Sequence, residues 1–368
     1  MHIEVEREKL LKYLELATRI SARHQTLPVL QCVLFEAKNS TGEILLRATN
    51  LELGFEARVA AHIKEGGTLA VPAVLLMQTI GLLYDIMVTL KTDGEMLVVE
   101  TGKSRTTIKT LSHEEFPMIP QLTGTPQTIN NHLFVLGIKT AVFATSQSSI
   151  KPELGSVLIQ QQKGQTLTFV ATDSFRLVEK VVPQKSVTLE GSLLVPAKNA
   201  LELARISEVV GTDPDIIVSE NQMALRFPDG VYVTTRLTEA AFPDYQQIIP
   251  KEFATTVTLL RGDLVHALKK TNIFANTFLQ VQVRINAKDN TITFSSDSGE
   301  SGKTEEVVPA TVEGEELSLS FNQRYLSDPL GLFADDSIIL RFSGIGRPMV
   351  MEGVSEKSLR YLVMPMNR

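Results

Sequence analysis

Apolar residues recur at helical spacing in three parts of the chain. In the segment 6–21, EREKLLKYLELATRIS, the residues Leu10, Leu14 and Ala17 fall on one helical face. Segments of the same character lie at 130–146 and 261–276. Each predicts an amphipathic helix at the start of a larger unit.

Shorter stretches of β-branched and alternating residues follow these helices and predict strands. Asp93-Gly94 and Asp229-Gly230 each stand between apolar runs, which is the sequence signal for a tight β-hairpin. Turns of this kind join antiparallel strands. The pattern therefore predicts α+β units, each with about two helices packed on antiparallel sheets.

Three sequence landmarks recur at one period. The first is a strand that ends in a short polar residue, at spacings of 123 and 124 positions: Asn50, Asp173 and Asp297. The second is a strand that runs into a helix, at spacings of 124 and 126: Pro72, Pro196 and Asn322. The third closes each unit, at spacings of 126 and 122: Phe116, Phe242 and Met364. We expect the prolines in the first helical turn and the asparagine at a helix cap.

A repeat of this length is close to the usual size of a domain, so it predicts three domains of one fold rather than a solenoid. The predicted limits are 1–122, 123–250 and 251–368. The same repeat accounts for the apolar end of the chain, YLVMPMNR, since Met364-Pro365 is the third copy of the Phe-Pro closing element.

The composition narrows the class of protein. Hydrophobic residues make up 43% of the chain, but no apolar run approaches the ~20 residues that span a bilayer. The N-terminus carries four glutamates and does not resemble a signal peptide, and the single cysteine, Cys32, excludes an intrachain disulfide. We expect a cytoplasmic protein. Its net charge of −6 means that any DNA binding would need a local basic surface.

The usual signatures of catalysis and metal binding are missing from the sequence. The six histidines form no His-x-x-x-His pattern, and TGKSR at 101–105 lacks the upstream glycine of a phosphate-binding loop. Asp173 and Asp297 are expected to cap their own turns rather than to act as paired catalytic carboxylates. We therefore expect no enzyme activity, no cofactor and no metal.

Several strings taken together resemble the bacterial DNA polymerase III beta subunits, the sliding clamps. They are VEREKLLKYLELATRI, TLPVLQCVLFEA, ATDSFRLVEKVVP, FPDYQQIIP and YLVMPMNR. The resemblance runs from end to end and includes the threefold repeat. It implies a head-to-tail homodimer, a ring of six similar domains around duplex DNA, which tethers a polymerase without any active site. The implied partners are duplex DNA bound regardless of sequence, a second copy of the chain, the DNA polymerase III alpha subunit, the clamp loader and other proteins with a clamp-binding motif, and no membrane.

In such a ring, helices line the hole and their basic residues offset phosphate charge without contacting bases. The resemblance therefore assigns a set of DNA-facing residues. They are Lys12, Arg19, Arg23, His24, Lys198, Arg205, Lys269, Lys270 and Arg324. Glutamates 8, 15 and 202 share or border these stripes, and a lysine stripe alone is usually only a solvated helix face.

The resemblance also implies a groove between the second and third domains for peptides of the Gln-Leu-x-Leu-Phe type. Its expected wall is Thr172, Ser174, Arg176, Leu177, Pro243, Ile248, Leu362, Met364, Pro365 and Met366. Methionine adapts to varied apolar partners, which suits a groove with several clients. The chain departs from the family at Lys151, where arginine is common, and at its end, which is Asn367-Arg368.

The family's dimer contact joins an edge strand of the first domain to the third domain of the partner. The implied residues are Arg105, Thr106, Ile108, Ile273 and Phe274. Thr106 stands where a large apolar residue is common, so one hypothesis is a weaker ring that opens readily.

Two other classes stay open from the residues alone. One is a repeat-built adaptor that binds apolar peptides without enclosing DNA, and the other is an enzyme with a diffuse site. Charge reversal on the inner helices distinguishes the clamp from the adaptor.

Overall fold

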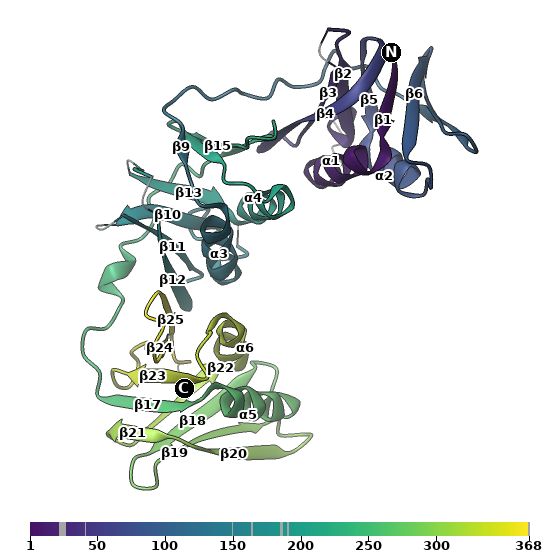
Figure 1. Ribbon diagram of the computed structural model, residues 1–368. Helices are drawn as coiled ribbons and strands as arrows, with labels where there is room; N and C mark the ends of the chain where they lie inside the picture. The colour runs from purple at the N-terminus through teal and green to yellow at the C-terminus, as the bar shows by residue number, and fades with distance from the viewer. Residues whose placement is uncertain are drawn as a thin grey trace. The chain divides into compact units, whose positions relative to one another are not determined.

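The computed structural model describes residues 1–21, 27–40, 42–148, 150–162, 165–184, 187–189 and 191–366, without the side chain of residue 162. The chain forms two compact units (Figure 1). The first comprises Met1–Val135, Ser186–Thr188 and Lys198–Leu237, and the second comprises Leu136–Lys185, Leu189–Ala197 and Thr238–Arg368. The second sequence repeat contributes to both units.

The described α-helices number two in each sequence repeat, as predicted. The α-helices are α1 (Arg7–Ile20), α2 (Ala73–Gly81), α3 (Asn131–Ala141), α4 (Ala197–Val210), α5 (Arg261–Ile273) and α6 (Gln323–Ser327). Short 3-10 helices are η1 (Pro28–Gln31), η2 (Val142–Ala144), η3 (Tyr245–Gln247) and η4 (Asp328–Leu332). The predicted apolar face of α1 is confirmed, because Leu10, Leu14 and Ala17 are fully buried.

A sheet of twelve strands forms the core of the first unit. Its strands are β1 (His2–Glu6), β2 (Cys32–Ala37), β3 (Glu43–Thr49), β4 (Leu53–Glu65), β5 (Gly67–Pro72), β6 (Met87–Asp93), β7 (Met96–Glu100), β8 (Arg105–Lys109), β9 (Gln127–Thr128), β14 (Asp215–Val218), β15 (Gln222–Arg226) and β16 (Tyr232–Arg236). β4 is 13 residues long, so it pairs with β1 and β3 and also with β16 of the second repeat. α1 and α2 pack against each other beside β2–β5 (Figure 1). β8 ends the sheet.

Two sheets form the second unit. Their strands are β10 (Ser156–Gln162), β11 (Thr166–Thr172), β12 (Arg176–Pro183), β13 (Ser192–Pro196), β17 (Thr255–Leu260), β18 (Gln280–Asn286), β19 (Thr291–Asp297), β20 (Lys303–Pro309), β21 (Thr311–Gly314), β22 (Leu317–Asn322), β23 (Ser337–Phe342), β24 (Met349–Gly353) and β25 (Leu359–Val363). The larger sheet has the order β13-β10-β11-β12-β25-β24-β23-β17-β21, so the pairing of β12 with β25 joins the second and third repeats.

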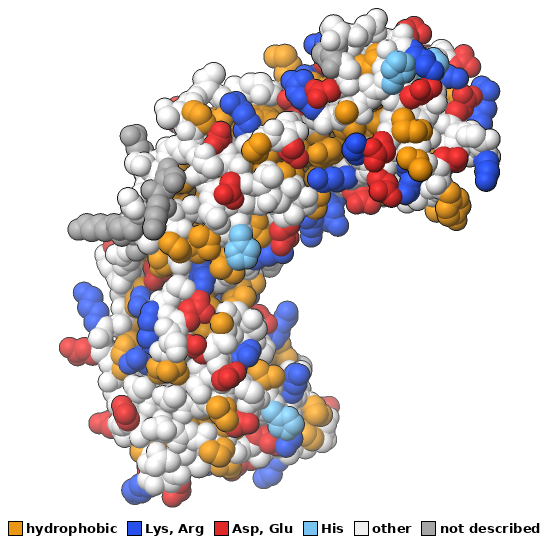
Figure 2. All heavy atoms as spheres, in the orientation of Figure 1, with side chains coloured by type: hydrophobic (Ala, Val, Ile, Leu, Met, Phe, Trp, Pro, Cys, Tyr) orange, Lys and Arg blue, Asp and Glu red, His pale blue; other side chains and the backbone are white. Residues whose placement is uncertain are grey.

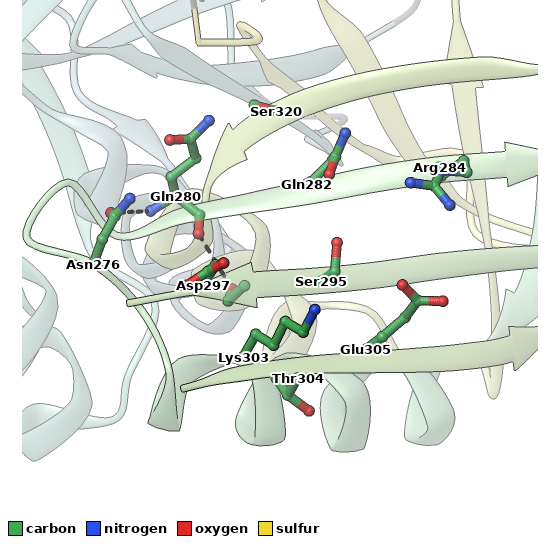
Figure 3. A pocket seen from close by; sticks show the side chains of 11 residues that line it. Asn276, Gln280, Gln282, Arg284, Ser295, Asp297, Lys303, Thr304, Glu305 and Ser320 are labelled. Carbon is green, nitrogen blue, oxygen red and sulfur yellow. Dashed lines mark hydrogen bonds between the residues drawn. The ribbon is translucent and has the colours of Figure 1, made fainter. Parts of the chain in front are cut away.

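The smaller sheet, β20-β19-β18-β22, has one covered and one open face. α5 packs on one face, over β19 and β20 (Figure 1). The opposite face carries polar side chains. Gln282 pairs in register with Ser295, and Ser295 with Glu305. These side chains, labelled in Figure 3, line a shallow hollow, which has a volume of about 690 Å³. This alternation is the ordinary pattern of an antiparallel sheet with one solvated side.

Both predicted hairpins are confirmed. β6 and β7 meet at Asp93↔Met96, and β15 and β16 at Arg226↔Tyr232. Gly94 and Gly230 have φ values of +56° and +86°, which glycine adopts without steric cost.

The turn residues behave as predicted, with one correction. Asn50 and Asp173 each accept two backbone N–H bonds from their own turns, and Asp297 accepts one from Gly299. Asn322 caps α6 by accepting from the Arg324 backbone N–H at 3.0 Å. The prediction for the prolines was wrong by one residue: Pro72 ends β5 directly before α2. The strand ladder extends to the proline, paired with Cys32, so the helix begins at the next residue.

The closing landmarks pack on equivalent apolar clusters. Phe116 lies against a cluster that includes Leu34 and Ala70. Phe242 lies against one that includes Leu158 and Leu194, the same positions one repeat later. The spacing that relates the sequence landmarks therefore also relates the buried residues beneath the first and second of them.

Candidate functional site

The tail of the chain lies beside the turn that precedes β12. β12 and β25 pair antiparallel with Leu177 opposite Leu362, which brings the turn and the tail together. The backbone N–H of Met364 donates to the carbonyl oxygen of Phe175 at 2.8 Å, and that of Met366 to Ser320 at 2.7 Å. The tail is therefore held at two points by backbone hydrogen bonds.

The turn itself is closed by its own side chains. Thr172 Oγ1 donates to the Arg176 carbonyl at 2.7 Å and accepts from the Ser174 N–H at 3.2 Å. Asp173 Oδ1 accepts from the N–H groups of Phe175 and Arg176, each at 3.0 Å. Ser174 has a φ of +78°, unusual for a residue with a side chain, and Leu51 has a φ of +75° in the equivalent turn of the first repeat.

An apolar hollow of about 50 Å³ opens between this turn and β25. It is lined by Thr172, Ser174, Phe175, Arg176, Leu177, Ile248, Pro348, Leu362, Val363 and Met364. Seven of the ten predicted groove residues are in this lining. Two of its lining residues, Leu177 and Leu362, belong to a buried apolar cluster that contains residues of both the second and the third repeat.

The other three predicted groove residues lie close by. Pro365 and Met366 line a second hollow of about 330 Å³, together with Ser320 and the exposed Ile345. Pro243 is exposed and lines neither hollow, but it follows Phe242, which packs on the cluster beneath the groove.

The guanidinium group of Arg176 forms hydrogen bonds within the chain through all three of its nitrogen atoms. Its Nε donates to Asp173 Oδ2 at 3.0 Å, its Nη1 to Asp328 Oδ2 at 2.6 Å, and its Nη2 to the carbonyl of Phe143 at 3.0 Å. The guanidinium also lies over the ring of Tyr325 at 4.6 Å. Arg176 therefore links the second repeat to the third beside the hollow. Its positive charge is balanced by the carboxylates of Asp173 and Asp328.

Phe175 was missed by the sequence-based assignment. Its side chain is 60% exposed, and it lines both the apolar hollow and a larger one of about 800 Å³ that includes Asn322 and Arg324. The sequence signal that could have identified Phe175 was its position inside the string TDSFRL, between predicted groove residues.

Pro348, Val363 and Ile345, which line the two hollows beside the tail, were also missed by the sequence-based assignment. Lys151 is exposed and does not belong to the lining of either hollow beside the tail.

The predicted DNA-facing residues that the structure describes all lie on helices. Lys12 and Arg19 are on α1, Lys198 and Arg205 on α4, Lys269 and Lys270 on α5, and Arg324 on α6. Two of them are paired: Arg205 donates to Glu202 at 2.6 Å and Lys270 to Glu306 at 2.9 Å. Arg23 and His24 lie outside the described residues.

The predicted dimer residues lie on two surfaces. β8 pairs only with β7 in the described sheet, and it exposes Arg105 while Thr106 is half-buried. Ile108 is buried in its own unit, so only its backbone is available at the edge. On the third repeat Ile273 is exposed and Phe274 is half-buried at the end of α5.

Among the described residues, no three His, Cys, Asp or Glu side chains are grouped as metal ligands would be. Within the same part of the chain, no helix combines the length and the apolar character that crossing a membrane requires.

Repeated α+β units, with the second and third repeats joined beside an apolar hollow, are the architecture of the sliding clamps. The chain belongs to the DNA polymerase III beta subunit family. The family models for the N-terminal, central and C-terminal domains match residues 1–120, 128–244 and 246–367.

Individual relatives can be aligned with the chain over nearly its full length. The chain is 31% identical to a beta sliding clamp of Pseudomonas putida, with 100% of both chains covered, and 28% identical to one of Synechococcus elongatus, with 99% of both covered. Among solved structures, it is similar to the DNA polymerase III beta subunit of Pseudomonas aeruginosa (TM-score 0.93, 27% identity, 100% of both chains) and to that of Thermotoga maritima (0.93, 25%, 100% of this chain and 99% of that chain). The predicted fold class, with three domains of the clamp fold, is confirmed.

Proposed function

We propose that this protein is the processivity factor of a bacterial replicase, a non-catalytic clamp that encircles duplex DNA and holds a polymerase on it. The observation that carries this function is the full-length family match across all three repeats. Two copies joined head to tail would form the ring, with the basic helix residues toward phosphates. We place this function in the cytoplasm and keep 1–122, 123–250 and 251–368 as the proposed domain limits.

The groove beside the tail is the proposed site for client peptides of the Gln-Leu-x-Leu-Phe type. The apolar hollow at Leu177 and Leu362 suits the apolar end of such a motif, and the methionines of the tail adapt to different clients. The polymerase alpha subunit, the clamp loader and other proteins with this motif are the proposed partners. Each would use the same site, so they would compete.

Binding of a fluorescent Gln-Leu-x-Leu-Phe peptide tests this site. We expect saturable binding to the intact chain and loss of at least about tenfold in affinity on removal of 364–368, because the truncation opens one wall of the hollow. The control is Val354→Ser, an exposed apolar position in the same unit. Circular dichroism checks that the truncated chain is folded. No binding to the intact chain would reject the site, whereas binding with no retention on circular DNA would favour the adaptor.

A further inference from the structure

One wall of the apolar hollow beside the tail comes from residues 242–253, which run between β16 and β17 and which we call the connecting segment. This wall is Ile248, whose side chain is 49% exposed. Hydrophobic side chains are scattered among charged ones over the visible face of the second unit (Figure 2), so exposure alone does not mark a binding surface. Ile248 is distinguished by lining the same hollow as Leu177 and Leu362.

The connecting segment has one deep anchor in the core. Tyr245 is 3% exposed, and it is the one buried residue between positions 241 and 254, all of which the structure describes. Its ring belongs to the buried cluster that contains Leu177 and Leu362. The ring of Phe242 meets it edge-on, with 6.3 Å between the ring centroids. Tyr245 is therefore the deepest attachment of the connecting segment to the second unit.

The hydroxyl group of Tyr245 is bonded to side chains of the larger sheet. It donates to Glu179 Oε2 on β12 at 2.8 Å and accepts from Gln160 Nε2 on β10 at 3.2 Å. The other carboxylate oxygen of Glu179 accepts from Arg360 on β25 at 3.3 Å. Burial and the carboxylate of Glu179 raise the pKa of Tyr245, so the hydroxyl remains a protonated donor at neutral pH. Tyr245 is thus tied to β12 directly and to β25 through Glu179.

A single turn of backbone connects this anchor to the wall of the hollow. Tyr245 begins η3, and Ile248 directly follows the last residue of η3. The backbone N–H of Ile248 donates to the carbonyl oxygen of Tyr245 at 3.0 Å. Because the connection is this short and is itself hydrogen-bonded, the position of Tyr245 fixes that of Ile248.

We propose that Tyr245 is a positioning residue for client binding, because its hydroxyl bond to Glu179 holds Ile248 in place as one wall of the groove. The inference rests on the proposed client groove and adds a residue that lines neither hollow beside the tail. A wall that is already in place loses less conformational freedom when a peptide binds, so the affinity is higher. Without the hydroxyl bond, each binding event would have to order the connecting segment.

The test is titration of the fluorescent Gln-Leu-x-Leu-Phe peptide with the full-length chain and its variants. Tyr245→Phe keeps the ring and removes only the hydroxyl, and it should raise the dissociation constant by about fivefold. Ile248→Ala removes the wall itself and should raise the constant by about tenfold. The double variant should bind as weakly as Ile248→Ala alone, because Tyr245 acts through Ile248. A residue that only stabilised the fold would multiply its effect into that of Ile248→Ala.

Tyr232→Phe is the matched control. Tyr232 is also buried, and its hydroxyl donates to the carbonyl oxygen of Pro120 at 2.9 Å and accepts from the Leu122 N–H at 3.0 Å. It therefore holds the segment between the first and second repeats, in the other compact unit. Tyr232→Phe should lower the resistance of the chain to urea and leave the peptide affinity unchanged. The same urea unfolding confirms that each variant is folded.

The outcomes separate the positioning role from the groove itself. An unchanged affinity of Tyr245→Phe would overturn the positioning role and leave the groove standing. Equal losses for Tyr245→Phe and Tyr232→Phe would show that overall stability governs binding, and would also overturn the role. Multiplied effects in the double variant would show that Tyr245 does not act through Ile248, with the same consequence. Absence of binding to the wild type would overturn the groove and the inference together.

Discussion

The guanidinium of Arg176 binds acceptors on three segments: the turn at Asp173, the 3-10 helix η4 at Asp328 and the carbonyl of Phe143. Because the donors of a guanidinium are fixed in a planar fork, lysine cannot reproduce this geometry. We therefore expect Arg176 to hold the wall of the proposed groove in place rather than to bind a client through its charge.

Replacement of Arg176 by alanine should lower the free energy of unfolding by about 2 kcal/mol, since it leaves Asp173 and Asp328 without their cation. Peptide affinity should fall as well, because the turn that lines the groove loses its anchor. Urea unfolding and peptide titration measure the two effects. Arg205→Ala, which removes an exposed pair with Glu202, should cost less than about 0.5 kcal/mol. Equal costs would contradict the role of Arg176.

Cys32 is buried at the start of β2, and burial raises the pKa of its thiol to about 11. The thiolate is the reactive form, so the native protein should be inert to a thiol reagent at about pH 8. Labelling should become complete in denaturant. Rapid labelling of the native protein would show that this strand opens readily.

The sequence predicted much at this scale. The Asx turns at Asn50, Asp173 and Asp297 follow from local chemistry, since each side chain reaches its own backbone. Seven of the ten groove residues line one hollow. Phe175 was missed because an exposed aromatic residue in a turn has no periodic signal, and its place beside Met364 depends on a strand pairing distant in sequence.

At the scale of elements, the pairing of β12 with β25 joins the second and third repeats into one sheet within the second unit. Lys180 on β12 is almost fully buried and binds Glu356 and Ser358, which precede β25. Burial alone would raise the pKa of Glu356, but the hydrogen bonds from Lys180 and Ser358 outweigh it and hold this pKa below its usual range. The ion pair therefore couples the strand pairing to pH.

The sign of the pH effect follows from the lowered pKa. The stabilising contribution is complete above the unfolded-state pKa of about 4.3 and is lost as the pH falls through the lower folded-state value. Glu356→Gln should cost about 2 kcal/mol at neutral pH, and this difference should disappear in acid. Unfolding by urea at a series of pH values measures it. A constant difference across the series would exclude the ion pair as its cause.

Local elements were predictable, whereas the sheets were not. The helix at Leu10–Ala17 and both Asp-Gly hairpins depend on neighbours in sequence, and all are present. The pairings of β4 with β16 and of β12 with β25 join different repeats. Their registers are set by packing between distant segments, and no periodic pattern in a single segment encodes them.

At the scale of the whole molecule, a protein of net charge −6 is proposed to surround a polyanion. The described cations proposed to face DNA lie on α1, α4, α5 and α6, and Arg205 and Lys270 already pair with glutamates. These pairs reduce the attraction of Arg205 and Lys270 to phosphate, so we expect the proposed clamp to be retained on DNA mainly by closure of the ring. Such a clamp should stay on circular DNA and leave linear DNA from its ends.

Charge reversal on α4 tests this balance. Lys198→Glu with Arg205→Glu should reduce the fraction of clamp retained on nicked circular DNA by about tenfold, because each reversal replaces attraction to phosphate by repulsion. Peptide binding should be unchanged, since neither residue lines the groove.

The matched control reverses the same amount of charge at Arg284, on β18, and at Lys288, in the turn after it. It should leave retention intact, because Arg284 lies on the polar face of the smaller sheet (Figure 3), Lys288 lies in the turn after β18, and neither is among the proposed DNA-facing residues. Equal losses in both variants would mean that net charge alone governs retention. No loss in either would mean that α4 does not face the DNA.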